Sequence, residues 1–164
     1  MDFGTALVSS LLAGVALFFW GGLAQNVLPW GIKSVQQRPN SDGTGEQIAQ
    51  SLNDGMMYLK DKVAAFVVAK PESYYSMGRF FAVEFVTQWL VGIALTLMFI
   101  ITPEQSLALR LSLILIIWLA GVTSIDLQYW NWWGFSNNYT LGVAINRLLG
   151  YLGAMLLISF ISGV

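Results

Sequence analysis

The stretch that decides the fold is Phe80–Ile101, FFAVEFVTQWLVGIALTLMFII, followed after a short break by Leu107–Ser124, LALRLSLILIIWLAGVTS. Both runs are apolar around the whole helical circumference, as helices embedded in lipid are. Each approaches or exceeds the about 20 residues that a helix needs to cross the hydrocarbon core of a bilayer. Strands of a membrane β-barrel would instead alternate with a period of two over shorter segments. The two runs therefore predict two successive transmembrane helices.

The break between these runs, Thr102-Pro103-Glu104-Gln105, is typical of a tight turn between two helices. Thr102 can cap the N-terminus of the following helix, Pro103 suits its first position and Gln105 its third. We therefore expect that helix to begin at Pro103. Arg110 lies early in the same helix, and we expect its guanidinium to extend outward to the membrane surface.

Two further apolar runs, Phe3–Leu23 and Leu141–Val164, lie outside this pair. Gly22-Leu23-Ala24 resembles a signal-peptide cleavage site, but the first residues carry no positive charge, so we expect a retained helix. The fold class is therefore an all-α membrane protein of four transmembrane helices, with a small α+β extramembrane insert between the first two. The expected helices are at about 3–24, 79–102, 103–126 and 139–163, and the insert is 25–78.

The insert contains signals for one short helix and one β-hairpin. Thr44-Gly45-Glu46-Gln47 matches a capping box and predicts a helix start. Met56–Leu59 and Val63–Ala69 are β-prone runs that flank Lys60-Asp61-Lys62, which predicts an antiparallel pair. Neither face of the second run is polar, so we expect both faces to be covered by the helix, the bundle or a partner. An isolated hairpin is only marginally stable in water.

Composition excludes several classes of function. The chain has 164 residues, of which 56% are apolar and 10% charged, against about 45–50% and about 25% in soluble domains. A net charge of −1 leaves no basic surface for nucleic acid. The sequence has no Cys and no His, which excludes thiol chemistry and Cys/His metal sites. We therefore expect neither a metal nor another cofactor, and a protein that is not an enzyme.

The distribution of basic residues bears on orientation. Six of the eight Lys and Arg residues lie on the side of the membrane that holds the insert. The positive-inside rule places such a segment in the cytoplasm, and acidic residues count for little in this rule. We therefore expect the insert to be cytoplasmic, although five acidic residues in the same segment leave the opposite orientation open. The six basic residues are Lys33, Arg38, Lys60, Lys62, Lys70 and Arg79.

Polar residues interrupt the apolar helices at matching depths. Glu84 and Gln88 are spaced by four on the second helix, so they share one face. Asp126 ends the third helix, and Asn146 and Arg147 occupy the same half of the fourth. Lipid cannot satisfy such groups, so we expect the five to gather, with Arg147 paired to Glu84 or Asp126. The cluster either fixes the helix register or binds a lipid headgroup, a small solute or a proton.

The connection between the third and fourth helices, Asp126–Tyr139, is rich in aromatic residues, including Trp130, Trp132 and Trp133. Trp and Tyr favour the headgroup region of a bilayer, which suggests an interfacial belt. The alternative is a docking surface for a partner, because Trp and Tyr dominate binding hot spots.

Several short motifs resemble a known group. Trp20-Gly21, Leu28-Pro29-Trp30, the strand Gly55–Leu59 and the segment Tyr139–Tyr151 are similar to parts of small four-helix bacterial integral membrane proteins of unknown function. The resemblance implies a protein of the bacterial inner (cytoplasmic) membrane with a small extramembrane insertion. It implies no activity.

Together these features predict a non-catalytic integral membrane protein that acts as an accessory or structural subunit of a larger membrane complex. Its expected partners are the lipid bilayer and other membrane protein subunits, or further copies of itself, and not nucleic acid. The alternative is a small solute-, lipid- or proton-handling protein that uses the polar cluster.

Overall fold

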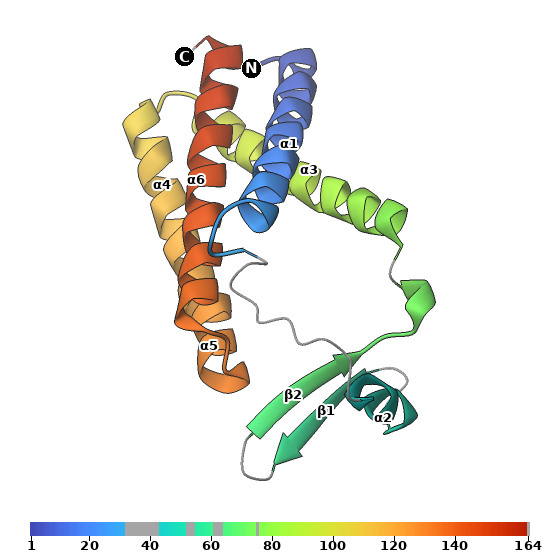
Figure 1. The fold of residues 1–164 in the computed structure, drawn as a ribbon. Coiled ribbons are helices and arrows are strands. Elements are labelled where there is room, and N and C mark those ends of the chain that lie inside the picture. Colours follow the sequence, from blue (N-terminus) through green and yellow to red (C-terminus); the bar gives the residue numbers. More distant parts are fainter. Residues whose placement is uncertain (32–42, 52–54, 61–63, 75, 164) are drawn as a thin grey trace. The chain divides into compact units, whose positions relative to one another are not determined.

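A computed structural model describes residues 1–31, 43–51, 55–60, 64–74 and 76–163 (Figure 1). In this part of the chain, four helical runs are long and apolar enough to cross a membrane. The shortest, with 24 residues, is about 36 Å long at about 1.5 Å per residue, which exceeds the about 30 Å hydrocarbon core. The predicted all-α class with four spanning helices is confirmed. The runs are α1 (Phe3–Asn26), α3 (Met77–Ile101), Leu107–Trp133 and α6 (Asn137–Ser162).

The third spanning run has an irregular middle. It consists of α4 (Leu107–Gly121), a π-helical segment, η3 (Val122–Asp126), and α5 (Leu127–Trp133). The expectation that the helix ends at 126 and that Trp130, Trp132 and Trp133 lie in a loop was wrong. The helix ends instead at Gly134, whose φ of 69° is a left-handed conformation that glycine adopts at little cost.

The turn between α3 and α4 also differs from expectation. Ser106, and not Thr102, caps α4, since its hydroxyl accepts the backbone N–H of Leu109. The Thr102 hydroxyl donates back to the Met98 carbonyl, 2.8 Å away, and so belongs to the end of α3. The sequence around 102–106 offers two acceptable caps, and this backward hydrogen bond selects the later one.

The core of the bundle forms around α6, which lies between α1 and α4 (Figure 1). Helix α3 crosses α1, and its buried residues begin only at Gly92, so its first half packs little against the bundle. The apolar side chains of the main core cluster come from all four spanning runs. They are Ala13, Leu17, Leu95, Met98, Phe99, Ile114, Ala154, Met155 and Ile158.

The insert contains α2 (Thr44–Ser51), β1 (Gly55–Lys60), β2 (Ala64–Ala69) and a short 3-10 helix, η2 (Glu72–Tyr74). The predicted antiparallel hairpin is confirmed, with Met57 opposite Val67. Its turn residues 61–63, which include Val63, lie outside the described residues. Met56 and Val68 oppose each other and are both exposed, so this patch of the hairpin is uncovered within the described chain. After η2, the guanidinium of Arg79 lies 4.1 Å from the centre of the Tyr74 ring.

Candidate functional site

The central polar contact of the bundle joins Arg147 of α6 to Asp126 at the end of η3. Arg147 Nη1 and Nη2 donate to the two carboxylate oxygens of Asp126 at 2.8 and 3.0 Å. Asp126 is 6% exposed and Arg147 23% exposed. Of the two carboxylates considered for Arg147, the structure therefore pairs it with Asp126. A paired geometry of this kind uses both terminal nitrogens of the guanidinium, so it fixes orientation as well as charge.

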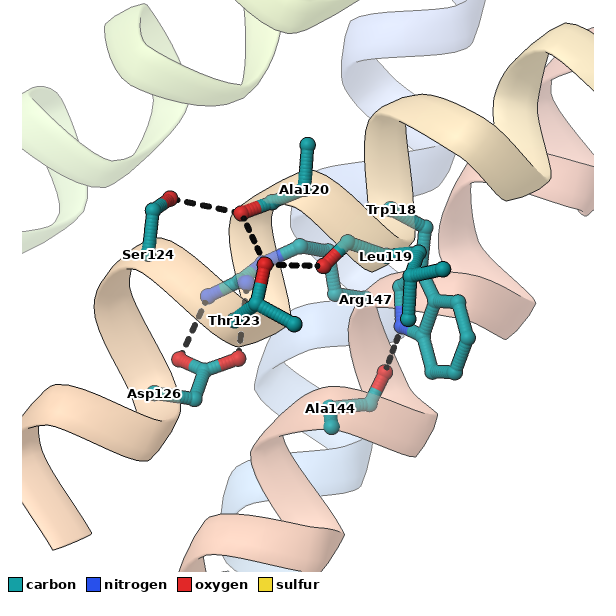
Figure 2. A network of polar contacts seen from close by, with 8 residues as sticks. All are labelled: Trp118, Leu119, Ala120, Thr123, Ser124, Asp126, Ala144 and Arg147. Atoms are coloured by element: carbon teal, nitrogen blue, oxygen red, sulfur yellow. Dashed lines mark hydrogen bonds and ion pairs between the residues drawn. The ribbon is translucent and has the colours of Figure 1, made fainter. Parts of the chain in front are cut away.

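The π-helical segment positions Asp126 for this contact (Figure 2). The N–H of Leu127 donates to the Val122 carbonyl five residues earlier, which is the wide π turn. Two side-chain hydroxyls also bind backbone carbonyls at the end of α4. Thr123 donates to the Leu119 carbonyl at 2.9 Å, and Ser124 donates to the Ala120 carbonyl at 2.6 Å. Single π turns inside α-helices occur frequently at functional sites.

Two further features fit α4 to α6 at the same level. The indole N–H of Trp118 donates to the Ala144 carbonyl at 2.7 Å (Figure 2). Gly121 leaves room for Arg147, since a Cβ there would lie 3.3 Å from Arg147 Nη1. The ion pair is therefore one member of a set of contacts that fixes the third spanning run against α6.

Asn146, the neighbour of Arg147, makes the corresponding contacts on the side of α1. Its side-chain Oδ1 accepts the indole N–H of Trp30 at 2.7 Å, and its backbone carbonyl accepts that of Trp20 at 2.9 Å. The Trp30 ring packs directly over Gly142, where any Cβ would collide with it. Consecutive residues of α6 thus face different neighbours, Asn146 the α1 side and Arg147 the α4 side. We call the pair Asn146-Arg147 the α6 joint.

Glu84 and Gln88 are not part of this joint in the described structure. Gln88 Nε2 donates to Glu84 Oε1 at 2.7 Å on the same helix. The pair faces Gly21 of α1, where a Cβ would lie 3.6 Å from Glu84 Oε1. Glu84 is exposed, about 10 Å along α3 from Met77 at about 1.5 Å per residue. The expected five-residue cluster is therefore divided into the α6 joint with Asp126 and a separate Glu84–Gln88 pair.

The three tryptophans proposed for partner docking lie on α5 and are exposed: Trp130 by 45%, Trp132 by 69% and Trp133 by 37%. The indole of Trp130 donates to Asn137 Oδ1 and that of Trp132 to Gln128 Oε1. The polar edges of Trp130 and Trp132 are thus satisfied within the chain, and their exposed apolar faces can contact lipid or protein.

Arg110 is the residue whose environment the sequence analysis missed. The expectation that it extends outward was wrong, because it is 1% exposed. Its guanidinium donates to the backbone carbonyl of Thr102 at 2.6 Å and stacks on Phe99 at 3.7 Å from the ring centre. Its signal in the sequence was its position in the first turn of α4, which brings it near the unpaired carbonyls at the end of α3.

The four long apolar helices indicate a helical integral membrane protein. No group of three or more Asp and Glu residues that could hold a metal ion occurs among the described residues. Comparison of the chain with models of protein families, with curated proteins and with solved structures finds no match.

Proposed function

We propose that this protein is a non-catalytic accessory or structural subunit that associates with another membrane protein inside the bilayer. The observation that carries the proposal is the exposed Glu84 on α3. Within the described chain its carboxylate accepts a hydrogen bond from Gln88 and forms no ion pair. A carboxylate that faces lipid is costly, so such residues normally face protein or a water-filled cavity.

The surroundings of Glu84 support the same interpretation. The first half of α3 has no buried residue. Four of its apolar side chains are at least half exposed: Phe81, Val83, Val86 and Leu90. These apolar side chains share the segment with Glu84 and Gln88. Val83, Val86 and Leu90 lie on another face of the helix. Phe81, three residues before Glu84, lies on the same face of α3, so a partner helix there would satisfy the carboxylate and cover this ring together. Interhelical hydrogen bonds of this type are worth about 0.6–2 kcal/mol in membranes.

The alternative function, handling of a solute, lipid or proton by the five-residue polar cluster, receives less support. Asp126 and Arg147 satisfy each other, and Asn146 Oδ1 is held by Trp30. Groups that already hold one another have little capacity left for a ligand. Their arrangement suits the other interpretation of the cluster, in which it fixes the register of the helices.

The test is purification of the full chain from its native membrane in a mild detergent, followed by native mass measurement. We expect a complex that contains a second polypeptide in fixed ratio. Glu84→Leu should release the chain from this complex without loss of folding, because the substitution makes α3 more compatible with lipid. Glu104→Gln, an exposed carboxylate in the α3–α4 turn, is the matched control and should leave the complex intact.

Two results would count against the proposal. A monomer in every mild detergent, with the same mass for Glu84→Leu, would contradict association through α3. A mass that is a multiple of 18.1 kDa would mean that the partner is a second copy and not a different subunit.

A further inference from the structure

A second polar site lies at the opposite end of the helices, around Arg110. This side chain holds the end of α3, donating to Thr102 Oγ1 at 3.2 Å and to the carbonyls of Thr102 and Pro103 at 2.6 and 3.3 Å. Carbonyls at a helix C-terminus carry partial negative charge and attract a cation. The contacts explain why the guanidinium is drawn inward, and they give it a structural role.

These contacts leave the charge of Arg110 unbalanced. Its Nη1 is buried and has no hydrogen-bond partner in the structure. In the described chain no carboxylate forms an ion pair with it, and its other neighbour is the neutral ring of Phe99. A buried charge normally requires both a counter-charge and full hydrogen bonding. Arg110 therefore has an N–H group and a positive charge with which it could bind an anion.

A cavity of about 200 Å³ opens beside this residue. Because about 10–15 Å³ of such space holds one water molecule, the cavity has room for a small polar headgroup. Its polar wall includes Arg110, Asp2, Thr5 and Ser162, and its apolar wall includes Phe99 and Ile161. Met1 lines the cavity beside Asp2. A charged side chain that is 1% exposed thus shares one cavity with hydroxyl groups and an acidic side chain.

The position of the cavity along the helices indicates which part of the bilayer surrounds it. It is formed where α1 begins, α6 ends and the α3–α4 turn crosses, so it lies at an end of the spanning helices. That level of a bilayer contains the phosphate groups of the lipids, next to the hydrocarbon that Phe99 and Ile161 resemble.

Asp2 restricts the choice of anion. Its two oxygens accept the N–H and the hydroxyl of Thr5 at 2.9 and 2.6 Å, and each oxygen keeps a further acceptor position. A carboxylate in the same cavity repels a ligand that carries only negative charge. A ligand with both a phosphate and an ammonium group would satisfy Arg110 and Asp2 together.

We propose that this cavity binds the headgroup of an amine-bearing phospholipid, with the phosphate on Arg110 and the ammonium on Asp2. The test uses the purified, delipidated full chain in detergent. The probes are short-chain phosphatidylethanolamine, short-chain phosphatidylglycerol, free phosphoethanolamine and inorganic phosphate, and binding is measured by native mass spectrometry. The variants are Arg110→Gln and Asp2→Asn, and Arg79→Gln is the control arginine.

Phosphatidylethanolamine should bind the unmodified chain more tightly than phosphatidylglycerol. Arg110→Gln should weaken it about tenfold or more, because a charge-assisted hydrogen bond is lost, while Arg79→Gln should not. Asp2→Asn retains the cap on Thr5 and should remove the preference for phosphatidylethanolamine over phosphatidylglycerol. This second variant keeps the test decisive if Arg110→Gln fails to fold.

Three outcomes would overturn the proposal. The first is no binding of any probe. The second is equal affinity for the two lipids in the unmodified chain, unchanged by Asp2→Asn. The third is loss of binding in Arg79→Gln as large as in Arg110→Gln. If free phosphoethanolamine binds as tightly as the lipid, the cavity binds a phosphate and an ammonium group, but the proposal that the ligand is a phospholipid is overturned.

Discussion

Gly92 of α3 lies directly against the backbone of α1 at Gly14. A Cβ at Gly92 would collide with the Ser10 carbonyl and lie 2.9 Å from the Gly14 nitrogen, and a Cβ at Gly14 would lie 2.7 Å from Trp89 Cα. Small residues at such a crossing let the two backbones approach closely. This contact is the point at which α3 begins to be buried.

Gly92→Ala should therefore destabilise the bundle, by about 1–3 kcal/mol, as overpacked cores do. The measurement is thermal unfolding in detergent. Gly22→Ala on α1 is the control, because nothing outside the adjoining helix backbone lies within 4 Å of the added Cβ. The control should be neutral or stabilising, since Ala favours helix over Gly by about 1 kcal/mol. Equal effects of the two substitutions would contradict a close crossing at Gly92.

The Arg147–Asp126 ion pair predicts strong coupling between the two residues. Arg147→Leu leaves a buried carboxylate, which costs about 3–5 kcal/mol in soluble proteins and less where water enters a bundle. Arg147→Leu combined with Asp126→Leu should recover much of the loss. Combination with Glu84→Leu should instead be additive, because Glu84 is bound to Gln88. Unfolding of the singles and doubles in detergent gives both coupling energies. Additivity for Asp126 would exclude the pair as a stabilising contact.

The hydrogen bond from Trp30 to Asn146 predicts a smaller effect. Trp30→Phe keeps most of the ring over Gly142 but removes the donor to Asn146 Oδ1. The loss should be about 0.5–1.5 kcal/mol, the net value of one such hydrogen bond. Trp132→Phe serves as the comparison, because that ring is 69% exposed. It should change the midpoint of unfolding less than Trp30→Phe does.

The N-cap of α1 predicts a dependence on pH. Hydrogen bonds from the side chain and then the backbone N–H of Thr5 hold the pKa of Asp2 below its usual 3.8. The fold therefore favours the ionised form, and its contribution to stability is complete above pH 3.8 and is lost as the pH falls through the lower folded-state pKa. Asp2→Asn keeps an acceptor that does not titrate. The difference in melting temperature between the two proteins should change only below pH 3.8, and a constant difference would refute the assignment.

Orientation in the membrane can be tested with single cysteines, because the chain has none. If the basic insert is cytoplasmic, Asp61→Cys should react with a membrane-impermeant thiol reagent only after the cells are permeabilised. Glu104→Cys, in the turn between α3 and α4, should react in intact cells. The reverse pattern would invert the orientation and leave the four spanning helices unchanged.

Much of the fold could be predicted from the sequence because long apolar runs, and β-prone runs that flank a short polar turn, are local signals. The hairpin pairing and the four spans depend on such signals alone. The choice of cap between Thr102 and Ser106 could not be predicted, since both suit the position and the choice depends on a backward hydrogen bond to Met98. The end of the third span was missed because Trp residues are compatible with either helix or interface.

The candidate sites were harder to predict because they depend on packing between helices. The sequence reduced the partner of Arg147 to two carboxylates, and the order of helices around α6 decides between them. The inward position of Arg110 depends on its hydrogen bonds to carbonyls at the end of α3. The spacing of apolar residues in the sequence does not predict these contacts.

The ion pair within the bundle also bears on how the chain enters the bilayer during synthesis. Asp126 precedes Arg147 by 21 residues, so it emerges from the ribosome first. A lone arginine near the middle of an inserting helix costs about 2.5–3.5 kcal/mol at the translocon. With the carboxylate already in place on the preceding span, α6 can leave the translocon as half of a neutral pair. The entry of the last helix into lipid is thereby coupled to the prior arrival of the third.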